Sequence, residues 1–329
     1  MKKNITISDV ALEAGVSKTT VSRYLNGQFG KMSQETKEKI EVVIKELNYR
    51  PNKQAQSLKS KRSYLIGVVV SDISNMYSSL LLKGIGEVLG KEGYQMIIMD
   101  AANSIEQEKE LLNKLIDQSV EGIILQASSR DANHYSFLKE ANIPILLVDR
   151  EVEPLIFPLV TTDNEDATKK IVQIILDKKY DEIVVISEPL KDIITREVRY
   201  NSVKEKVLEN KKEVKLIEVD KKLDLEQVLS ELVNSTKKTA IFASNGRMLM
   251  DILTILVTKK IEIPLDIGIV GFDDWNLSAL VGPGITSVEQ KTKLIGEESG
   301  KKILSYLDDE PIVIETFIVP ADIQLRNSL

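Results

Sequence analysis

The feature that most constrains the fold of this chain is an alternation of short apolar segments with amphipathic ones, which runs twice through residues 64–270. Short apolar runs are typical of buried parallel strands, and the stretches between them have the length and periodicity of helices. Before residue 163 we expect strands at 64–70, 94–99, 122–125 and 143–148, with helices at 76–92 and 104–118. After it we expect strands at 183–186, 214–217, 240–243 and 267–270, with helices at about 165–177, from about 197 and at 247–260. The pattern predicts an α/β fold of two doubly wound halves, with a ligand at the carboxyl ends of the strands between them.

The first 62 residues differ from the rest of the chain in charge. They carry 13 basic and 6 acidic residues, whereas the remainder carries 31 basic and 44 acidic residues, and the whole chain has a net charge of −6. An acidic body repels polyphosphate, so any contact with nucleic acid is expected in the basic head. On charge alone, a solvated basic surface is as good an interpretation as a nucleic-acid interface.

The pattern of caps and turns in the head predicts a helix, a tight turn and a second helix. Ser8 is the expected N-cap of the first helix, Gly15 supplies the turn, and Ser17 caps the second helix. At 100° per residue, the polar side chains of the second helix share a face about 140° wide. That face comprises Lys18, Thr19, Ser22, Arg23 and Asn26. Such a face suits the major groove of DNA, and the short glycine turn favours a helix-turn-helix over a merely solvated amphipathic helix.

A third amphipathic helix and a polar segment follow. Ser33 is expected to begin the helix, which carries its apolar residues on one side. Residues 48–60 have almost no apolar side chains to bury, so we expect this segment to be disordered on its own. Leu58 is the exception, because it is large and apolar and has no evident local apolar partner.

The segment from Ile7 to Asn26 resembles the DNA-binding head of the lactose-repressor/galactose-repressor family of bacterial transcription regulators. Residues 47–58 resemble the hinge of the same family, and the two α/β halves resemble its periplasmic-binding-protein-like effector domain. The likeness implies a helix-turn-helix head at 1–48, a hinge at 49–62 and an effector domain at 63–329. Within the effector domain it implies an N-subdomain at about 63–161 and 291–320, and a C-subdomain at about 162–290 and 321–329.

The resemblance implies two sets of contacts with operator DNA. The expected DNA-binding residues are Ser17, Lys18, Thr19, Ser22, Arg23 and Asn26 in the head, and Asn52, Gln54, Ala55 and Leu58 in the hinge. In the family the hinge helix folds only on the operator, where a leucine, here Leu58, wedges into the minor groove and kinks the DNA. Since one head covers a half-site, we expect a homodimer on a pseudopalindromic operator. The chain leaves no room for a C-terminal heptad tail, so a tetramer is not expected.

The same resemblance implies a small sugar or sugar acid bound between the two halves. The expected effector-binding residues are Tyr77, Gln126, Asp149, Arg150, Arg199, Asn245, Asp273, Trp275 and Gln290. Gly246 departs from the family, which has an aspartate after the asparagine. Arg150, Arg196 and Arg199 together with this lost acid favour an anionic sugar, such as a hexuronate or a keto-deoxy sugar acid. The alternative is that Arg150 pairs with Asp149 and Arg196 points to solvent, which leaves a neutral sugar.

Residues 271–275 and 281–286 add a weaker likeness to members of the family that sense 2-keto-3-deoxygluconate. The sequence does not give the sign of control, because relatives include both inducer-released and corepressor-assisted repressors. The expected function is therefore a sequence-specific repressor of carbohydrate-utilisation genes, with a corepressor-dependent repressor or a solute-binding protein without DNA function as alternatives.

Composition excludes several other classes. The chain has no cysteine and one histidine, His134, so thiolate sites and multi-histidine metal sites are excluded, and no cofactor or metal is expected. A glycine-rich phosphate loop is absent, and the pair Asp273–Asp274 has no evident nucleophile or acid beside it, so we expect no enzyme activity and no catalytic residues. No run of about 18 apolar residues and no secretory signal occurs, which predicts a cytoplasmic protein without a membrane partner.

Overall fold

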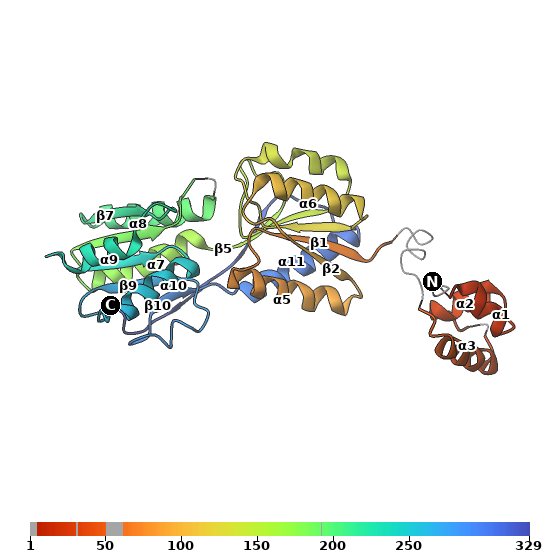
Figure 1. The fold of residues 1–329 in the computed structure, drawn as a ribbon. Helices are drawn as coiled ribbons and strands as arrows, with labels where there is room; N and C mark the ends of the chain where they lie inside the picture. The colour runs from red at the N-terminus through yellow and green to blue at the C-terminus, as the bar shows by residue number, and fades with distance from the viewer. Residues whose placement is uncertain (1–4, 31, 51–61, 192) are drawn as a thin grey trace. The chain divides into compact units, whose positions relative to one another are not determined.

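The computed structural model describes residues 5–30, 32–50, 62–191 and 193–329. The chain forms two compact units, residues 1–63 and residues 64–329, and each is described by itself (Figure 1).

The first unit is built from three helices around a small apolar core. Its helices are α1 (Ile7–Glu13), α2 (Lys18–Leu25) and α3 (Gln34–Glu46). Its core consists of Val10, Ala11, Ala14, Val21, Ile40 and Val43. Gly15 has a φ of +65°, which a side chain would strain, and this residue turns the chain between α1 and α2 as the sequence predicts.

The helix caps of the first unit follow the sequence closely, with one correction. The hydroxyl of Ser17 accepts from the backbone N–H of Thr20 at 3.1 Å, so the predicted cap of α2 is confirmed. Ser33 is the N-cap of α3, also as predicted. The predicted N-cap of α1, Ser8, is wrong. Thr6 caps this helix instead, because its side chain accepts from the N–H of Asp9 while the Asp9 carboxylate accepts from the N–H of Thr6, which satisfies two helix-end donors at once.

The second unit contains two lobes, each a six-stranded sheet with helices on both faces (Figure 1). The first sheet has the order β11-β5-β4-β3-β1-β2, and all its strands are parallel. Its strands are β1 (Leu65–Val70), β2 (Gln95–Asp100), β3 (Gly122–Leu125), β4 (Ile145–Val148), β5 (Leu159–Thr162) and β11 (Thr316–Val319). Its helices are α5 (Met76–Lys91), α6 (Ile105–Asp117), the 3-10 helix η1 (Ala132–Ala141) and α11 (Thr292–Leu307).

The sheet of the second lobe has the order β12-β10-β9-β8-β6-β7 and is parallel except for β12. Its strands are β6 (Glu182–Ser187), β7 (Glu213–Glu218), β8 (Thr239–Ala243), β9 (Gly268–Phe272), β10 (Thr286–Glu289) and β12 (Asp322–Gln324). Its helices are α7 (Asn164–Asp177), α8 (Ile194–Glu209), α9 (Leu225–Val233) and α10 (Gly246–Thr258). Each lobe therefore has an apolar cluster on either side of its sheet, and the predicted pair of α/β halves is confirmed.

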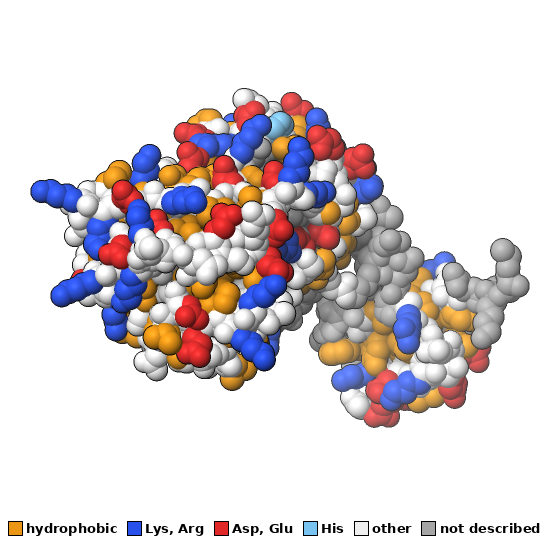
Figure 2. All heavy atoms as spheres, turned by 60° about the vertical axis from the view of Figure 1, so that its left-hand side comes forward, with side chains coloured by type: hydrophobic (Ala, Val, Ile, Leu, Met, Phe, Trp, Pro, Cys, Tyr) orange, Lys and Arg blue, Asp and Glu red, His pale blue; other side chains and the backbone are white. Residues whose placement is uncertain are grey.

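The chain passes between the lobes three times, between β5 and α7, between β10 and α11, and between β11 and β12. Neither lobe is therefore a continuous stretch of sequence. On the face of residues 64–329 that Figure 2 shows, basic and acidic side chains are interspersed.

Candidate ligand cleft and nucleic-acid interface

A polar pocket lies between the two lobes, where loops after the parallel strands of both sheets converge. It is lined by Asp72, Asn75, Tyr77, Asn103, Gln126, Asp149, Arg150, Glu188, Ile193, Thr195, Arg196, Arg199, Asn245, Arg247, Asp273 and Gln290. All the effector-binding residues expected from the sequence belong to this lining, except Trp275. We call this pocket the cleft site. Its position at the carboxyl ends of the strands agrees with the general rule for doubly wound sheets.

Asp273 is held rigidly on the second lobe. Its carboxylate accepts from the side-chain amide of Gln290 and from the backbone N–H of Gly246, the latter at 3.1 Å. Burial raises the pKa of Asp273, and the nearby Arg199 guanidinium and the two hydrogen bonds oppose that rise. The carboxylate is thus fixed in place as an acceptor at the wall of the cleft.

Arg199 projects from α8 into the interior beside Asp273 and is almost completely buried. Its Nε donates to Oδ1 of Asn164 and its Nη1 donates to the carbonyl of Ser244, both at 2.8 Å. The guanidinium also lies 3.6 Å from the ring centre of Phe272. Burial lowers the pKa of Arg199, and the carboxylates of Asp273 and Asp149 counteract this. Since its hydrogen-bond acceptors are neutral, this guanidinium keeps attraction for an anionic group.

The first lobe contributes a chain of hydrogen bonds that ends at Asp149. Ser71 donates to Oε1 of Gln126 from its N–H at 3.1 Å and from its hydroxyl at 3.0 Å. Gln126 in turn donates to Oδ2 of Asp149 at 2.8 Å. Burial raises the pKa of Tyr77 well above its usual range, so its phenol stays protonated. Oη of Tyr77 and Oε1 of Gln290 are two of the buried side-chain atoms that have no hydrogen-bond partner among the described residues, and both residues line the cleft site.

Several ion pairs in the lining were not predicted from the sequence. Arg247 of the second lobe donates to the Asp72 carboxylate of the first lobe at 2.5 Å and to the Ser74 hydroxyl at 3.0 Å. Arg196 pairs with Glu188 at 3.3 Å. Four arginines and four carboxylates line the pocket, so acidic and basic side chains are equal in number there. Glu188 directly follows β6, and Arg247 lies in the first turn of α10. These positions at a strand end and a helix start are the sequence signals by which both residues could have been predicted to line the cleft.

Of the two alternatives raised for the arginines, the solvent-facing Arg196 is wrong and the pairing of Arg150 with Asp149 is confirmed. Arg196 does not point to solvent, because its side chain is only 18% exposed and also donates to the carbonyl of Pro189 at 3.0 Å. Arg150 lies 4.0 Å from the Asp149 carboxylate and donates to the carbonyl of Ala127 at 3.2 Å. Its contact with Asp149 is thus longer than a hydrogen bond.

Trp275 does not line the cleft site, although the sequence analysis counts it among the effector-binding residues. A Cβ built on Gly246 would lie 2.3 Å from Cη2 of the Trp275 ring. The same ring packs against the apolar cluster of the first lobe that contains Tyr77 and Leu81. The indole therefore fills the space that a side chain at position 246 would need.

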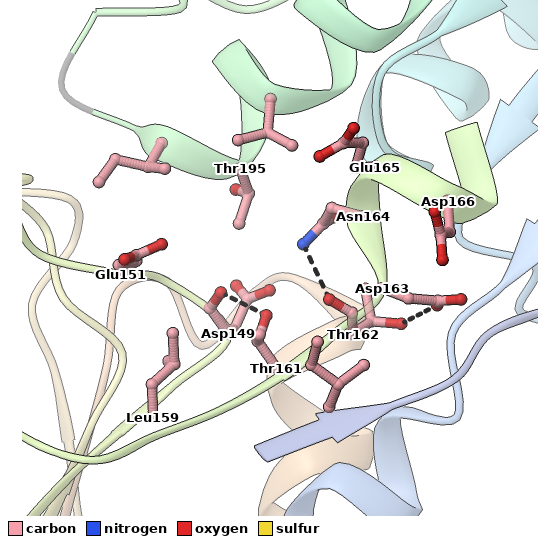
Figure 3. Close-up of a pocket in the computed structure, with 13 residues that line it drawn as sticks. Asp149, Glu151, Leu159, Thr161, Thr162, Asp163, Asn164, Glu165, Asp166 and Thr195 are labelled. Carbon is pink, nitrogen blue, oxygen red and sulfur yellow. Dashed lines mark hydrogen bonds between the residues drawn. The ribbon is translucent and has the colours of Figure 1, made fainter. Parts of the chain in front are cut away.

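A second pocket, larger than the cleft site, opens beside β5 and the start of α7 (Figure 3). Its volume is about 340 Å³, against about 60 Å³ for the cleft site, and Asp149 and Thr195 line both. Figure 3 shows the carboxylates of Glu151, Asp163 and Glu165 around it, together with Asp149. The smaller pocket is the candidate ligand site, because donors and acceptors of both signs converge on it, whereas the larger one is lined by five acidic side chains and no basic one.

The predicted DNA-binding residues of the head lie on α2 and its ends. Lys18, Thr19, Arg23 and Asn26 are exposed, Ser22 is half-buried, and Val21 on the opposite side is buried. Ser17 is exposed but its hydroxyl already caps the helix. The hinge residues Asn52, Gln54, Ala55 and Leu58 lie outside the described residues.

The described parts of the chain contain neither a metal-site arrangement nor a membrane-spanning helix. No group of three or more His, Cys, Asp or Glu side chains there has the arrangement of a metal site. No helix there has both the length and the apolar character needed to span a membrane.

The chain is similar to known proteins over most of its length. Residues 6–52 match the model of bacterial regulatory proteins of the lacI family, and residues 66–311 match that of a periplasmic binding protein domain. The chain is 39% identical to the HTH-type transcriptional regulator KdgR of Bacillus subtilis, over 98% of this chain and 97% of that protein. It is 31% identical to catabolite control protein A of Priestia megaterium, over 99% of both. A structure of the Lac repressor dimer bound to operator and the anti-inducer ONPF superposes with a TM-score of 0.86 at 25% identity, over 99% of both chains.

Proposed function

Because the chain belongs to the lacI family of bacterial regulatory proteins and is a DNA-binding transcriptional regulator, we propose that it represses carbohydrate-utilisation genes under the control of a small sugar acid. The observation that carries the proposal is the cleft site itself. Buried polar atoms without partners, on Tyr77 and Gln290, stand beside fixed carboxylates and guanidinium groups, and the same chain carries a helix-turn-helix with an exposed polar face.

The DNA-binding form is proposed to be a homodimer on a pseudopalindromic operator. One head offers a single recognition helix, α2, and a two-fold pair of such helices reads two half-sites one helical turn or a multiple apart. The solved relative named above is a dimer on its operator. Lys18, Thr19 and Arg23 are the proposed base-contacting residues, and Leu58 is the proposed minor-groove wedge.

The effector is proposed to be a sugar acid, such as 2-keto-3-deoxygluconate or a hexuronate. The hydrogen bonds of Arg199 and Arg150 go to neutral oxygens, and Asp149 faces Arg150 only at 4.0 Å, so each guanidinium can form a further charge-assisted hydrogen bond with a carboxylate. Asp149 and Asp273 are placed to accept from sugar hydroxyls. A neutral sugar is the alternative, and the equal numbers of arginines and carboxylates in the lining are the observation that favours it.

Calorimetry with the purified chain separates these two classes. The panel consists of 2-keto-3-deoxygluconate, D-glucuronate, D-galacturonate, D-glucose and D-galactose. We expect at least one of the acids to bind and the neutral hexoses to bind more weakly. Binding of a neutral hexose together with no measurable binding of any acid refutes the proposed effector class.

Control of DNA binding by the effector is a coupling between two sites. We expect the bound acid to change operator affinity by about 5- to 150-fold, the usual size of such coupling. Fluorescence anisotropy of a labelled operator, with and without the acid, measures it. Weaker binding with acid supports release by an inducer, whereas tighter binding makes the acid a corepressor.

Two other functions predict different results. A solute-binding protein without DNA function gives no shift of random duplex DNA at low salt, whereas the proposed regulator shifts it. We also propose that the chain binds its effector without converting it. Incubation of the acid with the protein, followed by mass spectrometry, is expected to return the acid unchanged.

A further inference from the structure

We propose that Glu188 is an internal carboxylate that occupies an anion subsite in the cleft, and that the carboxylate of a sugar-acid effector takes its place on Arg196 and Asn245. This inference rests on the proposed function, since it assumes that the cleft site binds a sugar acid. It goes further by naming the subsite, its present occupant and the exchange that sets the charge of the effector.

Glu188 lies in the candidate ligand site. It directly follows β6, at the strand end where ligands of this fold bind, and it lines the cleft site. Its carboxylate accepts from Nδ2 of Asn245 and pairs with Nη2 of Arg196 at 3.3 Å. Both partners also line the cleft, so the three side chains form a guanidinium, an amide and a carboxylate in mutual contact inside the pocket.

These partners are the groups that a protein uses to bind an acid. A guanidinium recognises a carboxylate through charge-assisted hydrogen bonds, and an amide N–H adds a second donor. Asn245 uses its Oδ1 to cap α10 by accepting from the N–H of Met248 at 2.9 Å. Its amide nitrogen is thereby aimed at Glu188, and it stays aimed at the same point when another carboxylate arrives.

The electrostatics of the lining require a carboxylate at this point. Arg247 is paired with Asp72, and the Asp149 and Asp273 carboxylates lie near Arg199. Arg196 is left with Glu188 as its ion-pair partner among the described residues. Burial lowers the pKa of Arg196, which means that this guanidinium is costly to keep charged without a compensating anion.

The space in the cleft requires a side chain to move. The cleft site has a volume of about 60 Å³, whereas pockets for small molecules usually hold about 300 Å³ or more. Glu188 has a long side chain that is 21% exposed and can swing outwards. Its departure frees room and two hydrogen-bond donors in one step.

The exchange selects an anion. A sugar acid that displaces Glu188 restores a carboxylate to Arg196, so the buried charge stays compensated. A neutral sugar in the same place leaves the guanidinium with hydroxyl oxygens alone, and the cost of breaking the ion pair is not recovered.

Calorimetry of a mutant cycle tests the exchange. The proteins are the wild type, Glu188→Gln, Arg196→Gln and the double variant, titrated with 2-keto-3-deoxygluconate, D-glucuronate and D-glucose. Glu209→Gln is the matched control, because it removes the same charge from the exposed end of α8. Thermal melting by circular dichroism verifies that every variant is folded.

We expect Glu188→Gln to bind the acid about 10- to 100-fold more tightly than the wild type, since the ligand no longer competes with a charged side chain. The gain for D-glucose is expected to be smaller, Glu209→Gln is expected to match the wild type, and the gain from Glu188→Gln is expected to vanish when Arg196 is also replaced. Equal acid affinity in the wild type and Glu188→Gln, or a gain that survives loss of Arg196, overturns the role of Glu188 and leaves the proposed effector class standing. No acid binding by any of the proteins overturns both.

Discussion

Replacement of Arg199 by methionine is expected to destabilise residues 64–329 by about 2–6 kcal/mol at neutral pH, because it leaves two buried acceptors without a donor at about 1–3 kcal/mol each. Methionine keeps most of the length and apolar bulk of the arginine stem. It removes two hydrogen bonds of 2.8 Å and the stacking of the guanidinium on Phe272. It also leaves the buried carboxylate of Asp273 without the cation that opposes the rise of its pKa.

The pH dependence of this loss has a definite sign. Without Arg199 the pKa of Asp273 rises further above its value in the unfolded chain. A carboxyl group with a raised folded pKa favours the folded state at low pH, and this contribution is lost as the pH rises through that pKa. The stability difference between wild type and variant is therefore expected to shrink as the pH is lowered from 7.5 towards 5.5.

Urea unfolding at the two pH values measures the effect. Trp275 is the single tryptophan of the chain, so its fluorescence reports on residues 64–329 without a signal from the head. Arg199→Lys is the control, since it keeps the charge and loses the fixed geometry of the guanidinium, and it is expected to cost less than the methionine. A loss below about 0.5 kcal/mol, within the usual range of surface substitutions, or a difference that widens at lower pH, refutes the reasoning.

Three further predictions concern the head, the hinge and the cleft. Arg23→Ala is expected to weaken operator binding by about 1–3 kcal/mol, the range of a good base contact, and to relax sequence preference; unchanged affinity and preference in an anisotropy titration contradict the assignment of α2. Leu58→Ala is expected to keep salt-sensitive binding of random DNA and to lose operator bending, measured by energy transfer between labelled DNA ends; bending equal to the wild type contradicts the wedge. Gly246→Ala is expected to lower stability by about 1–3 kcal/mol through overpacking against Trp275, because its new Cβ would lie 2.3 Å from the ring; Trp275→Leu in the same chain is expected to recover most of the loss in urea unfolding, and no recovery argues against the overlap.

The alternation of apolar runs was sufficient to predict the two lobes and most of the strands that line the cleft, because buried parallel strands leave a strong local pattern. The last two strands lack that pattern. β11 and β12 span only residues 316–319 and 322–324 at sheet edges, and Val319 is the one buried side chain in them. The N-cap of α1 could not be predicted from residue type either. The choice between Ser8 and Thr6 depends on the reciprocal hydrogen bonds between Thr6 and Asp9.

Most residues that line the cleft could be predicted because they follow the ends of strands, whereas the ion pairs between them could not. Asp72 and Arg247 are 175 residues apart, and only the folded chain brings them to 2.5 Å. The sequence showed three arginines near the cleft together with Asp149 and Asp273, but not Glu188, which pairs with Arg196. Trp275 is the opposite case, because it was expected among the effector-binding residues and does not line the cleft. Its ring packs over Gly246, which has no side chain to exclude it.

The three passages of the chain between the lobes have a consequence for synthesis on the ribosome. The head is a continuous segment, so it can fold as soon as it emerges. The first lobe cannot complete its core at that stage, because α11 and β11 are encoded after nearly all of the second lobe. For most of the time of translation the growing chain therefore carries a finished DNA-binding head beside a body whose first sheet still has an open edge, and both lobes close together only when the last strands arrive.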